Sequence, residues 1–178
     1  RALKAFMRAD PDVILLGEIR DENTARNAIK AAETGHLVLA TLHTSSITGA
    51  ANRLRDLGVP SHELNSVLRS VLAQTLIRTL CTTCKGEDSE HCPTCLGTGY
   101  SARTIVSECY HFKGEEDVKD CISNGAVKWS RMIDDAYYRY SIGDTDKTEL
   151  IRVFGAEGEQ VIEDNLKKNM LEKQESKE

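Results

Sequence analysis

The chain has 178 residues, of which 40% are hydrophobic, 5% aromatic and 29% charged, which is an ordinary composition for one good core or two small ones. Its formal net charge of -5 and pI near 5.6 argue against non-specific binding to nucleic acid or to acidic lipid. These whole-chain values do not exclude a local basic patch. No apolar run approaches the roughly 20 residues needed to span a bilayer and the start has no signal-peptide pattern, so we expect a cytoplasmic protein.

The chain starts at Arg1 without a methionine, inside a segment with helical apolar spacing (Ala2, Leu3, Ala5, Phe6). We therefore expect it to be a piece of a longer protein. Next comes the pattern of a complete βαβ unit, from Asp10 to Thr44. The unbroken apolar run of residues 13–16 predicts a strand buried on both faces. Asp21 is suited to cap a helix that ends at Gly35, and a second strand is predicted for residues 37–42.

Polar side chains follow both predicted strands. Glu18, Arg20 and Asp21 follow the first strand, while Thr41, His43 and Thr44 lie at the end of the second. A right-handed crossover places Glu18 and His43 at the same sheet edge, where open α/β folds bind their ligands. A carboxylate there can hold Mg²⁺ through water or orient an attacking water. The alternative is structural: Glu18 pairs with Arg20 or a helix N-terminus, and His43 is a satisfied strand-end residue.

The rest of the chain is predicted to be mainly helical. We expect a helix over residues 46–57, a second, strongly amphipathic one over 63–80, and irregular backbone over 81–100. A strand is predicted for residues 103–109. Helices are expected over residues 114–123, 127–141, with Trp129 on the apolar face, and from 146 to the end.

Four of the six cysteines form two closely spaced pairs, Cys81-Thr-Thr-Cys84 and Cys92-Pro-Thr-Cys95. This spacing predicts a closed, tetrahedral, structural Zn²⁺ site, whose four thiolates leave no position for His91. The second pair also resembles one repeat of a DnaJ-type zinc domain, and a zinc-ribbon nucleic-acid reader is a further option, although the loop has no basic face. Cys109 and Cys121 are interpreted as small buried residues.

The amino-acid sequences of several segments resemble those of one protein family. MRADPDVILLGEIRD (7–21) matches the Walker B signature of the secretion-type ATPases that power type II secretion and type IV pilus assembly. TGHLVLATLHTSS (34–46) resembles that family's histidine box, and the likeness continues through ANRLRDLGV, SVLAQTLIRTLC and the four-cysteine loop to about residue 108. Tetracysteine loops are typical of the secretion and assembly branches. Residues 109–178 match little beyond TELIRVFG, which is similar to the family's closing helix.

The resemblance implies a hexameric ATPase that uses ATP and Mg²⁺ at the inner membrane, in contact with platform and docking proteins of a secretion or pilus machine. It implies catalytic roles for Glu18 and His43, and nucleotide or Mg²⁺ contacts for Arg20, Asp21, Thr41 and Thr44. Arg20, Arg53 and Arg103 are open to two interpretations, as subunit-boundary groups or as solvated charges. No nucleic-acid partner and no membrane span are expected.

Two family features are missing from these residues, the G-x-x-x-x-G-K-[ST] phosphate loop and the acidic box. Without the backbone nest and the lysine that hold phosphates, we expect the chain to be inactive alone. The expected fold is α/β. Residues 1–80 form part of a RecA-like ATPase domain, 81–100 a zinc-binding loop and 101–178 a mainly helical domain. The alternative is a zinc-binding docking module without nucleotide chemistry. A RecA-like sheet without its phosphate-loop strand has an unpaired edge and an uncovered apolar face, which we expect to cause association or to destabilise the chain.

Overall fold

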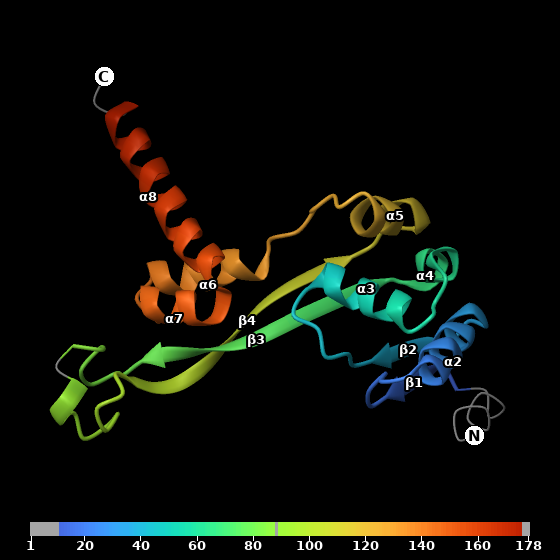
Figure 1. Ribbon diagram of the computed structural model, residues 1–178, viewed down its shortest axis with the longest axis horizontal. Coiled ribbons are helices and arrows are strands. Elements are labelled where there is room, and N and C mark those ends of the chain that lie inside the picture. The colour runs from blue at the N-terminus through green and yellow to red at the C-terminus, as the bar shows by residue number, and fades with distance from the viewer. Residues whose placement is uncertain (1–10, 88, 176–178) are drawn as a thin grey trace. The chain divides into compact units, whose positions relative to one another are not determined.

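The computed structural model describes residues 11–87 and 89–175, so the expected helix at Ala2–Phe6 lies outside the described residues. The elements, in chain order, are β1 (Val13–Leu16), α2 (Glu22–Glu33), β2 (Leu37–Ala40), α3 (Ile47–Asp56), α4 (Ser61–Val67), β3 (Ser70–Leu80), η2 (Ser89–His91), β4 (Tyr100–His111), α5 (Glu115–Ser123), α6 (Met132–Ser141), α7 (Lys147–Phe154) and α8 (Ala156–Glu175) (Figure 1). They form two compact units. Unit 1 contains residues up to 73 together with 109–129, and unit 2 contains 74–108 together with the residues from 130 onward.

The predicted βαβ unit is present in unit 1. Strands β1 and β2 pair in parallel, with Val13 opposite Leu37 and Leu16 opposite Ala40. Asp21 caps α2, and Gly35 follows the helix with a φ of +96°, a left-handed conformation that favours glycine. The predicted extent of the second strand is too long by two residues, because pairing with β1 ends at Ala40.

The expected burial of β1 on both faces is wrong for this chain. Ile14 is buried, but Leu15 is 76% exposed and Val13 is 52% exposed. Successive side chains of a strand point to opposite faces, and α2 packs against β2. The other face is apolar and lacks a cover among the described residues, as the sequence predicted.

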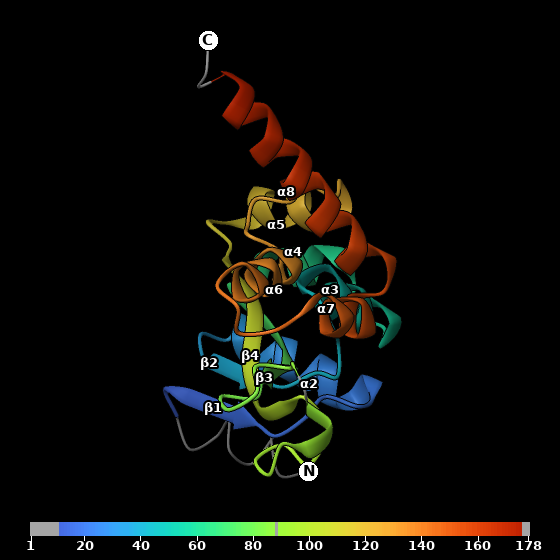
Figure 2. The same cartoon turned by 90° about the vertical axis from the view of Figure 1, so that its left-hand side faces the viewer.

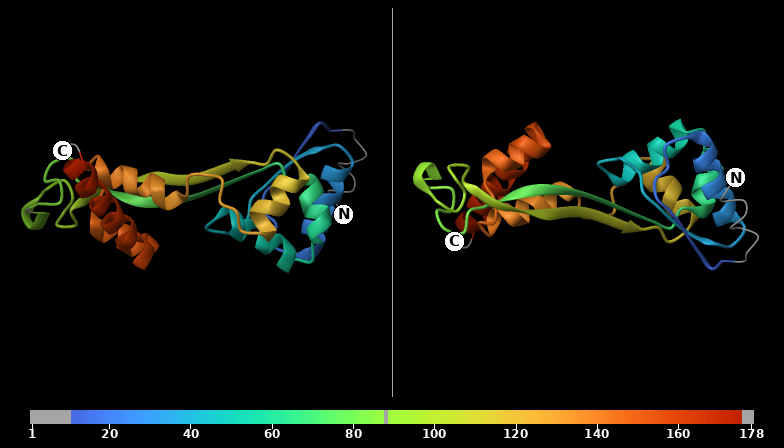
Figure 3. Two further views of the ribbon diagram at one scale, coloured as in Figure 1. Left: turned by 90° about the horizontal axis from the view of Figure 1, so that it is seen from above. Right: turned by 90° about the horizontal axis from the view of Figure 1, so that it is seen from below.

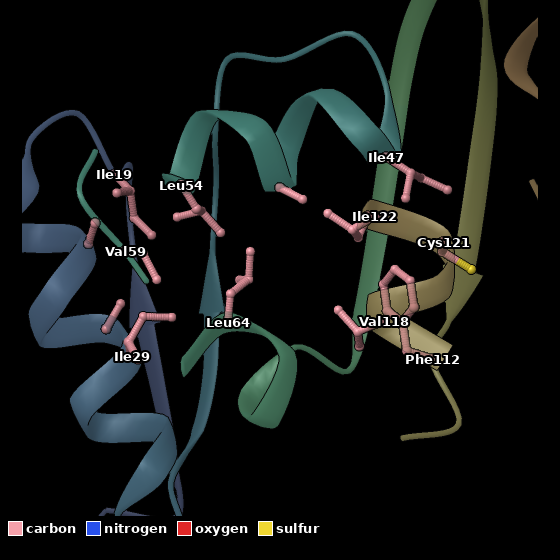
Figure 4. Packing of buried hydrophobic residues seen from close by; sticks show 13 residues of the cluster. Ile19, Ile29, Ile47, Leu54, Val59, Leu64, Phe112, Val118, Cys121 and Ile122 are labelled. Carbon is pink, nitrogen blue, oxygen red and sulfur yellow. The ribbon is translucent and has the colours of Figure 1, made fainter. Parts of the chain in front are cut away.

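The core of unit 1 lies among helices α2, α3, α4 and α5 (Figure 4). Its largest fully buried side chains are those of Ile47, Leu64, Phe112 and Val118. Ser46 caps α3 by accepting a hydrogen bond from Gly49 N at 3.0 Å, so the predicted helix over 46–57 is confirmed within one residue at each end.

The predicted helix over residues 63–80 is wrong. Helix α4 ends at Val67, and strand β3 begins at Ser70 and pairs with β4 in a two-stranded sheet. Figure 3 shows the two strands side by side in both views, and their arrows run in opposite directions. Residues 70–77 alternate between exposed and covered positions, with Ala73 and Ile77 buried. The apolar residues of this segment fit the spacing of a helix, but those at Leu72 and Leu76 also fit the period of two of a strand. Pairing with β4 selects the strand.

Three other expectations change in detail. Strand β4 is longer than the predicted 103–109. Helix α6 starts at Met132, and Trp129 instead packs against Tyr110 in unit 1, with ring centroids 5.3 Å apart. The single helix expected from residue 146 is split at Gly155, where φ is +61°. Cys121 is buried as predicted, whereas Cys109 is exposed, so its predicted burial is wrong.

In unit 2, helices α6, α7 and α8 pack on one another (Figure 2). Glu149 of α7 is fully buried and binds the side chains of Arg78 and Arg152. Tyr100 of β4 donates a hydrogen bond to Asp146, the N-cap of α7, at 2.9 Å. Within the described residues, no helix is both long enough and apolar enough to cross a membrane.

Candidate functional site

The carboxyl ends of β1 and β2 bring Glu18 and His43 together. Beyond the paired strands, Ile19 N donates a hydrogen bond to Thr41 O at 3.0 Å, which keeps the two chain segments adjacent. Glu18 Oε1 lies 3.2 Å from His43 Nε2. The side chain of Glu18 is 21% exposed and that of His43 is 86% exposed, so the pair is open to a ligand from solvent.

Arg20 completes this group of charges. Its Nη2 lies 2.6 Å from Glu18 Oε2, so each oxygen of the carboxylate has its own partner. The hydrogen bond from Arg20 lowers the pKa of Glu18. The positive charge of Arg20, and that of His43 when it is protonated, act in the same direction, while desolvation opposes them. A carboxylate with a lowered pKa stays ionised at neutral pH. It can therefore accept a hydrogen bond from water or ligate a hydrated cation, but it is a weak base.

The other predicted residues of this region have defined local partners. Asp21 accepts hydrogen bonds from Thr24 N and Thr24 Oγ1, both at 2.9 Å, and these bonds lower its pKa. The hydroxyl of Thr41 donates to Gly17 O, which ties the residue before Glu18 to the end of β2. Thr44 N donates to Leu42 O at 3.1 Å. Asp21 therefore caps α2, and Thr41 holds the turn that carries Glu18.

The four paired cysteines form one cluster in unit 2. Their sulfur atoms all lie within 4.8 Å of one another. The sulfurs of Cys81 and Cys92 are 3.8 Å apart, and those of Cys84 and Cys95 are 3.7 Å apart. A tetrahedral Zn²⁺ with Zn–S bonds of about 2.3 Å places its sulfurs about 3.8 Å apart. The cluster therefore has the dimensions of a tetrathiolate metal site, and His91 is not among the grouped ligands.

The backbone around the cluster favours thiolates. Backbone N–H groups lower the pKa of Cys92 to about 6, with Cys95 N as the main donor, and likewise lower that of Cys81, with Cys84 N as the main donor. Burial raises the pKa of Cys84 to about 12. Gly99 N donates to the sulfur of Cys95 at 3.3 Å. The four sulfur atoms are close together and backbone N–H groups favour their ionised form. A divalent ion can therefore displace the remaining thiol protons and bind all four sulfurs.

Sequence reasoning overlooked two groups that the structure brings together. The hydroxyls of Thr83 and Thr94 lie 2.8 Å apart and join the two cysteine pairs. The repeated order Cys-x-Thr-Cys could have indicated this bond, because threonine occupies the same place in both pairs. The second group is the ion-paired cluster of Glu149 with Arg78 and Arg152. The sequence pattern at these positions predicted helices and gave no sign of the ion pairs.

Comparison with known proteins identifies the fold and the family. The structure resembles the ATPase DotB of Legionella pneumophila with a TM-score of 0.62, at 21% identity over 83% of this chain and 39% of that one. It resembles the pilus retraction motor PilT, solved with bound ADP, with a TM-score of 0.52, at 25% identity over 86% of this chain and 38% of that one. The chain therefore shares its α/β fold with a part of each of these two proteins.

Sequence comparison gives the family itself. Residues 1–155 match the family model described as Type II/IV secretion system protein, and the chain belongs to this family. The type II secretion system protein HxcR of Pseudomonas aeruginosa is 39% identical over 85% of this chain and 35% of its own length. The type II secretion system ATPase E of Vibrio cholerae is 43% identical over 61% of this chain and 26% of its own. The chain thus spans about a third of the length of the curated relatives that it matches.

Proposed function

We propose that the protein to which this chain corresponds is a hexameric ATPase that hydrolyses ATP to power type II protein secretion or type IV pilus assembly. The proposal is supported by the family and by a relative named as a type II secretion system ATPase. The observation that carries it is the 3.2 Å approach of Glu18 and His43 at the carboxyl ends of two parallel strands. This is the edge at which open α/β sheets bind their ligands.

In this proposal Glu18 orients the water that attacks the terminal phosphate of ATP. Alternatively, its carboxylate holds the hydrated Mg²⁺ that accompanies the nucleotide. The lowered pKa of Glu18 favours these roles over general-base catalysis, because basicity falls with the pKa whereas the ionised oxygens still accept hydrogen bonds. His43 is the exposed partner of the pair, and we propose that it donates a hydrogen bond to the phosphate. Mg²⁺, when bound with ATP, neutralises charge that develops on the phosphate oxygens.

The neighbouring residues are assigned supporting roles. Arg20 and Thr44 are proposed to contact the nucleotide or the water around Mg²⁺. Asp21 and Thr41 are proposed to position the backbone around Glu18, since the side chains of both already form hydrogen bonds with the local backbone. We further propose that residues 1–80 act as part of a RecA-like domain, 81–100 as a zinc-binding loop and 101–178 as a helical domain.

The four cysteines are proposed to hold one structural Zn²⁺, because their spacing matches a tetrahedral tetrathiolate site. The parent protein is proposed to work in the cytoplasm at the inner membrane, in contact with platform and docking proteins. The 178 residues contain no phosphate loop, so we propose that they do not turn over ATP alone.

The test is ATP hydrolysis by the full-length protein with Glu18→Gln. We expect kcat to fall by about two to four orders of magnitude while ATP binding persists, because glutamine keeps the shape of the side chain but loses its charge. The matched control is Glu22→Gln, an exposed glutamate of α2 that pairs with Arg26, which should retain activity. His43→Ala should lower kcat as well, whereas His62→Ala on the exposed side of α4 should not.

Unchanged hydrolysis in Glu18→Gln would overturn the assignment of the site. If the full-length protein binds zinc but hydrolyses no ATP, the second candidate holds instead, a zinc-binding docking module without nucleotide chemistry. The four-cysteine cluster is the observation that favours this candidate.

A further inference from the structure

The backbone on both sides of Glu18 is held against the end of β2. Gly17 O accepts a hydrogen bond from the hydroxyl of Thr41, and Ile19 N donates to Thr41 O at 3.0 Å. These bonds set the position of the backbone. The direction in which the Glu18 side chain leaves it depends also on how the neighbouring side chains pack.

The side chain of Ile19 is buried in the core of unit 1. It is 5% exposed and belongs to the apolar cluster among helices α2, α3, α4 and α5. The residues on either side of it, Glu18 and Arg20, bind each other at 2.6 Å, and Arg20 is exposed to solvent. The core side chain and the two charged side chains therefore leave the segment in different directions. Because burial of an apolar side chain is favourable, Ile19 opposes a rotation that would turn Glu18 away from His43.

The residues that surround Ile19 are themselves fixed. Figure 4 shows Ile19 in the same part of the buried cluster as Leu54 and Val59. Leu54 belongs to the last turn of α3 and is 7% exposed, and Val59 is 3% exposed. Val59 N donates a hydrogen bond to Leu54 O at 3.1 Å, which joins the two residues. A close-packed surface of this kind transmits a displacement instead of absorbing it.

Helix α3 connects this surface with His43. The helix begins at its N-cap Ser46, which is three residues after His43 and accepts a hydrogen bond from Gly49 N at 3.0 Å. Its other end carries Leu54, which packs in the cluster that buries Ile19. One helix therefore holds the segment of His43 at its start and the segment of Glu18 at its end.

We propose that Ile19 is a positioning residue for the pair of Glu18 and His43. Its burial against Leu54 and Val59 directs the Glu18 carboxylate toward the histidine. The expected effect on ATP hydrolysis rests on the proposed function, whereas the placement of the carboxylate is measurable without nucleotide. Since Glu18 is proposed to act on the attacking water or on hydrated Mg²⁺, a small displacement lowers the rate of hydrolysis more than the binding of ATP.

The experiment compares alanine substitutions at Ile19 and at Ile29. Ile29 is the matched control, because it is the same type of residue, is 7% exposed and belongs to the same cluster, but lies in the second half of α2. Each substitution leaves a cavity in one core, so both should lower the melting temperature to a similar extent. In the full-length protein, Ile19→Ala should lower kcat by about tenfold to a hundredfold with little change in KM for ATP. Ile29→Ala should nearly retain kcat, and the conservative Ile19→Val should restore most of it.

A second measurement follows the placement of Glu18 in the 178-residue chain itself. Arg20, together with His43 when it is protonated, lowers the pKa of the Glu18 carboxyl. Ile19→Ala should raise this pKa toward its ordinary value, because the carboxylate moves away from the two positive groups. Ile29→Ala should leave it as it is in the unaltered chain. Carbon NMR of the side-chain carboxyl over an acid titration measures the pKa in each variant.

Equal changes in Ile19→Ala and Ile29→Ala, or a Glu18 pKa that stays the same in Ile19→Ala, would overturn the proposal and leave Ile19 as an ordinary core residue. Unchanged hydrolysis in Glu18→Gln would instead overturn the proposed function. The NMR titration would then still decide whether Ile19 positions Glu18. Should Ile19→Ala not fold, Ile19→Val and Ile29→Val provide the same comparison, with a smaller rise in the pKa expected for Ile19→Val alone.

Discussion

The carboxylate of Glu149 on α7 binds Arg78 on β3 through three groups: Oε1 accepts from Arg78 N at 2.7 Å, and Oε2 accepts from Nε and lies near Nη2, both at 2.6 Å. The Glu149 side chain has no exposed surface, and Arg152 binds it from the same helix. A buried carboxylate loses its hydration, so it is tolerated only where such partners replace the water. This contact attaches α7 to the sheet within unit 2.

Glu149→Gln should destabilise the protein by about 1–3 kcal/mol, since the buried side chain loses its charge-assisted hydrogen bonds to two arginines that stay partly hydrated. Urea unfolding followed by circular dichroism measures the change. Glu163→Gln, at an exposed position of α8, is the control and should leave the free energy of unfolding nearly unchanged. Equal stability of the two variants would refute a structural role for Glu149.

The same pair predicts a pH dependence. Burial alone would raise the pKa of Glu149, but hydrogen bonds from Arg152 and Arg78 hold it at about 2, below the ordinary 4.5. A folded-state pKa below the unfolded one stabilises the fold at pH values above the unfolded pKa. The contribution is therefore complete above about pH 4.5 and is lost as the pH falls toward about 2. The stability difference between the unaltered chain and Glu149→Gln should shrink over this range in acid titrations.

The cysteine cluster predicts one bound zinc per chain by elemental analysis. Chelation should lower the melting temperature by more than about 5 °C, because metal binding supplies folding free energy and 1 kcal/mol shifts the transition by a few degrees. Cys95→Ser should lose the metal. The exposed Cys109 lies outside the cluster, so Cys109→Ser should keep both the zinc and the melting temperature. An unaltered chain without zinc, with melting indifferent to chelation, would refute the metal site.

Gly158 marks the close approach of α7 and α8. A Cβ atom at this position would lie 2.5 Å from Leu150 O and 2.7 Å from Leu150 C, both backbone atoms that cannot rotate away. Gly158→Ala should therefore destabilise unit 2 by about 1–3 kcal/mol, despite the better helix propensity of alanine. Thermal melting measures the effect, with Lys167→Ala on the same helix as a control expected to change little. A stable Gly158→Ala variant would show that the two helices can separate without cost.

The bare face of β1 and β2 predicts self-association. Val13, Leu15, Leu37 and Leu39 are 49–76% exposed, and the strand register places Leu15 beside Leu39. Burial of this apolar patch between copies is favourable, so the sedimentation coefficient should rise with protein concentration. Leu15→Lys should suppress the rise. Leu166→Lys, at a leucine of α8 that is 55% exposed, should not, and equal effects of the two variants would disprove a specific role for this face.

Much of unit 1 could be predicted from the sequence, because local signals agree there. The apolar runs at Val13–Leu16 and from Leu37, the cap at Asp21 and the glycine at position 35 specify strand, helix and strand in order. The handedness of the crossover then brings Glu18 and His43 to one edge. The spacing of the four cysteines predicts their cluster in the same way, since each pair is closed by its own short turn.

Tertiary structure decided the features that depend on distant partners. Residues 70–80 have a pattern that fits a helical stripe, yet they form a strand because β4 pairs with them. Trp129 has the spacing of the following helix but packs against Tyr110 in unit 1. Glu149 has the appearance of a surface residue, and its burial follows only once Arg78 on β3 is placed against α7. Local capping, turn and spacing rules act within a few residues, whereas strand pairing and charge burial are set by partners far along the chain.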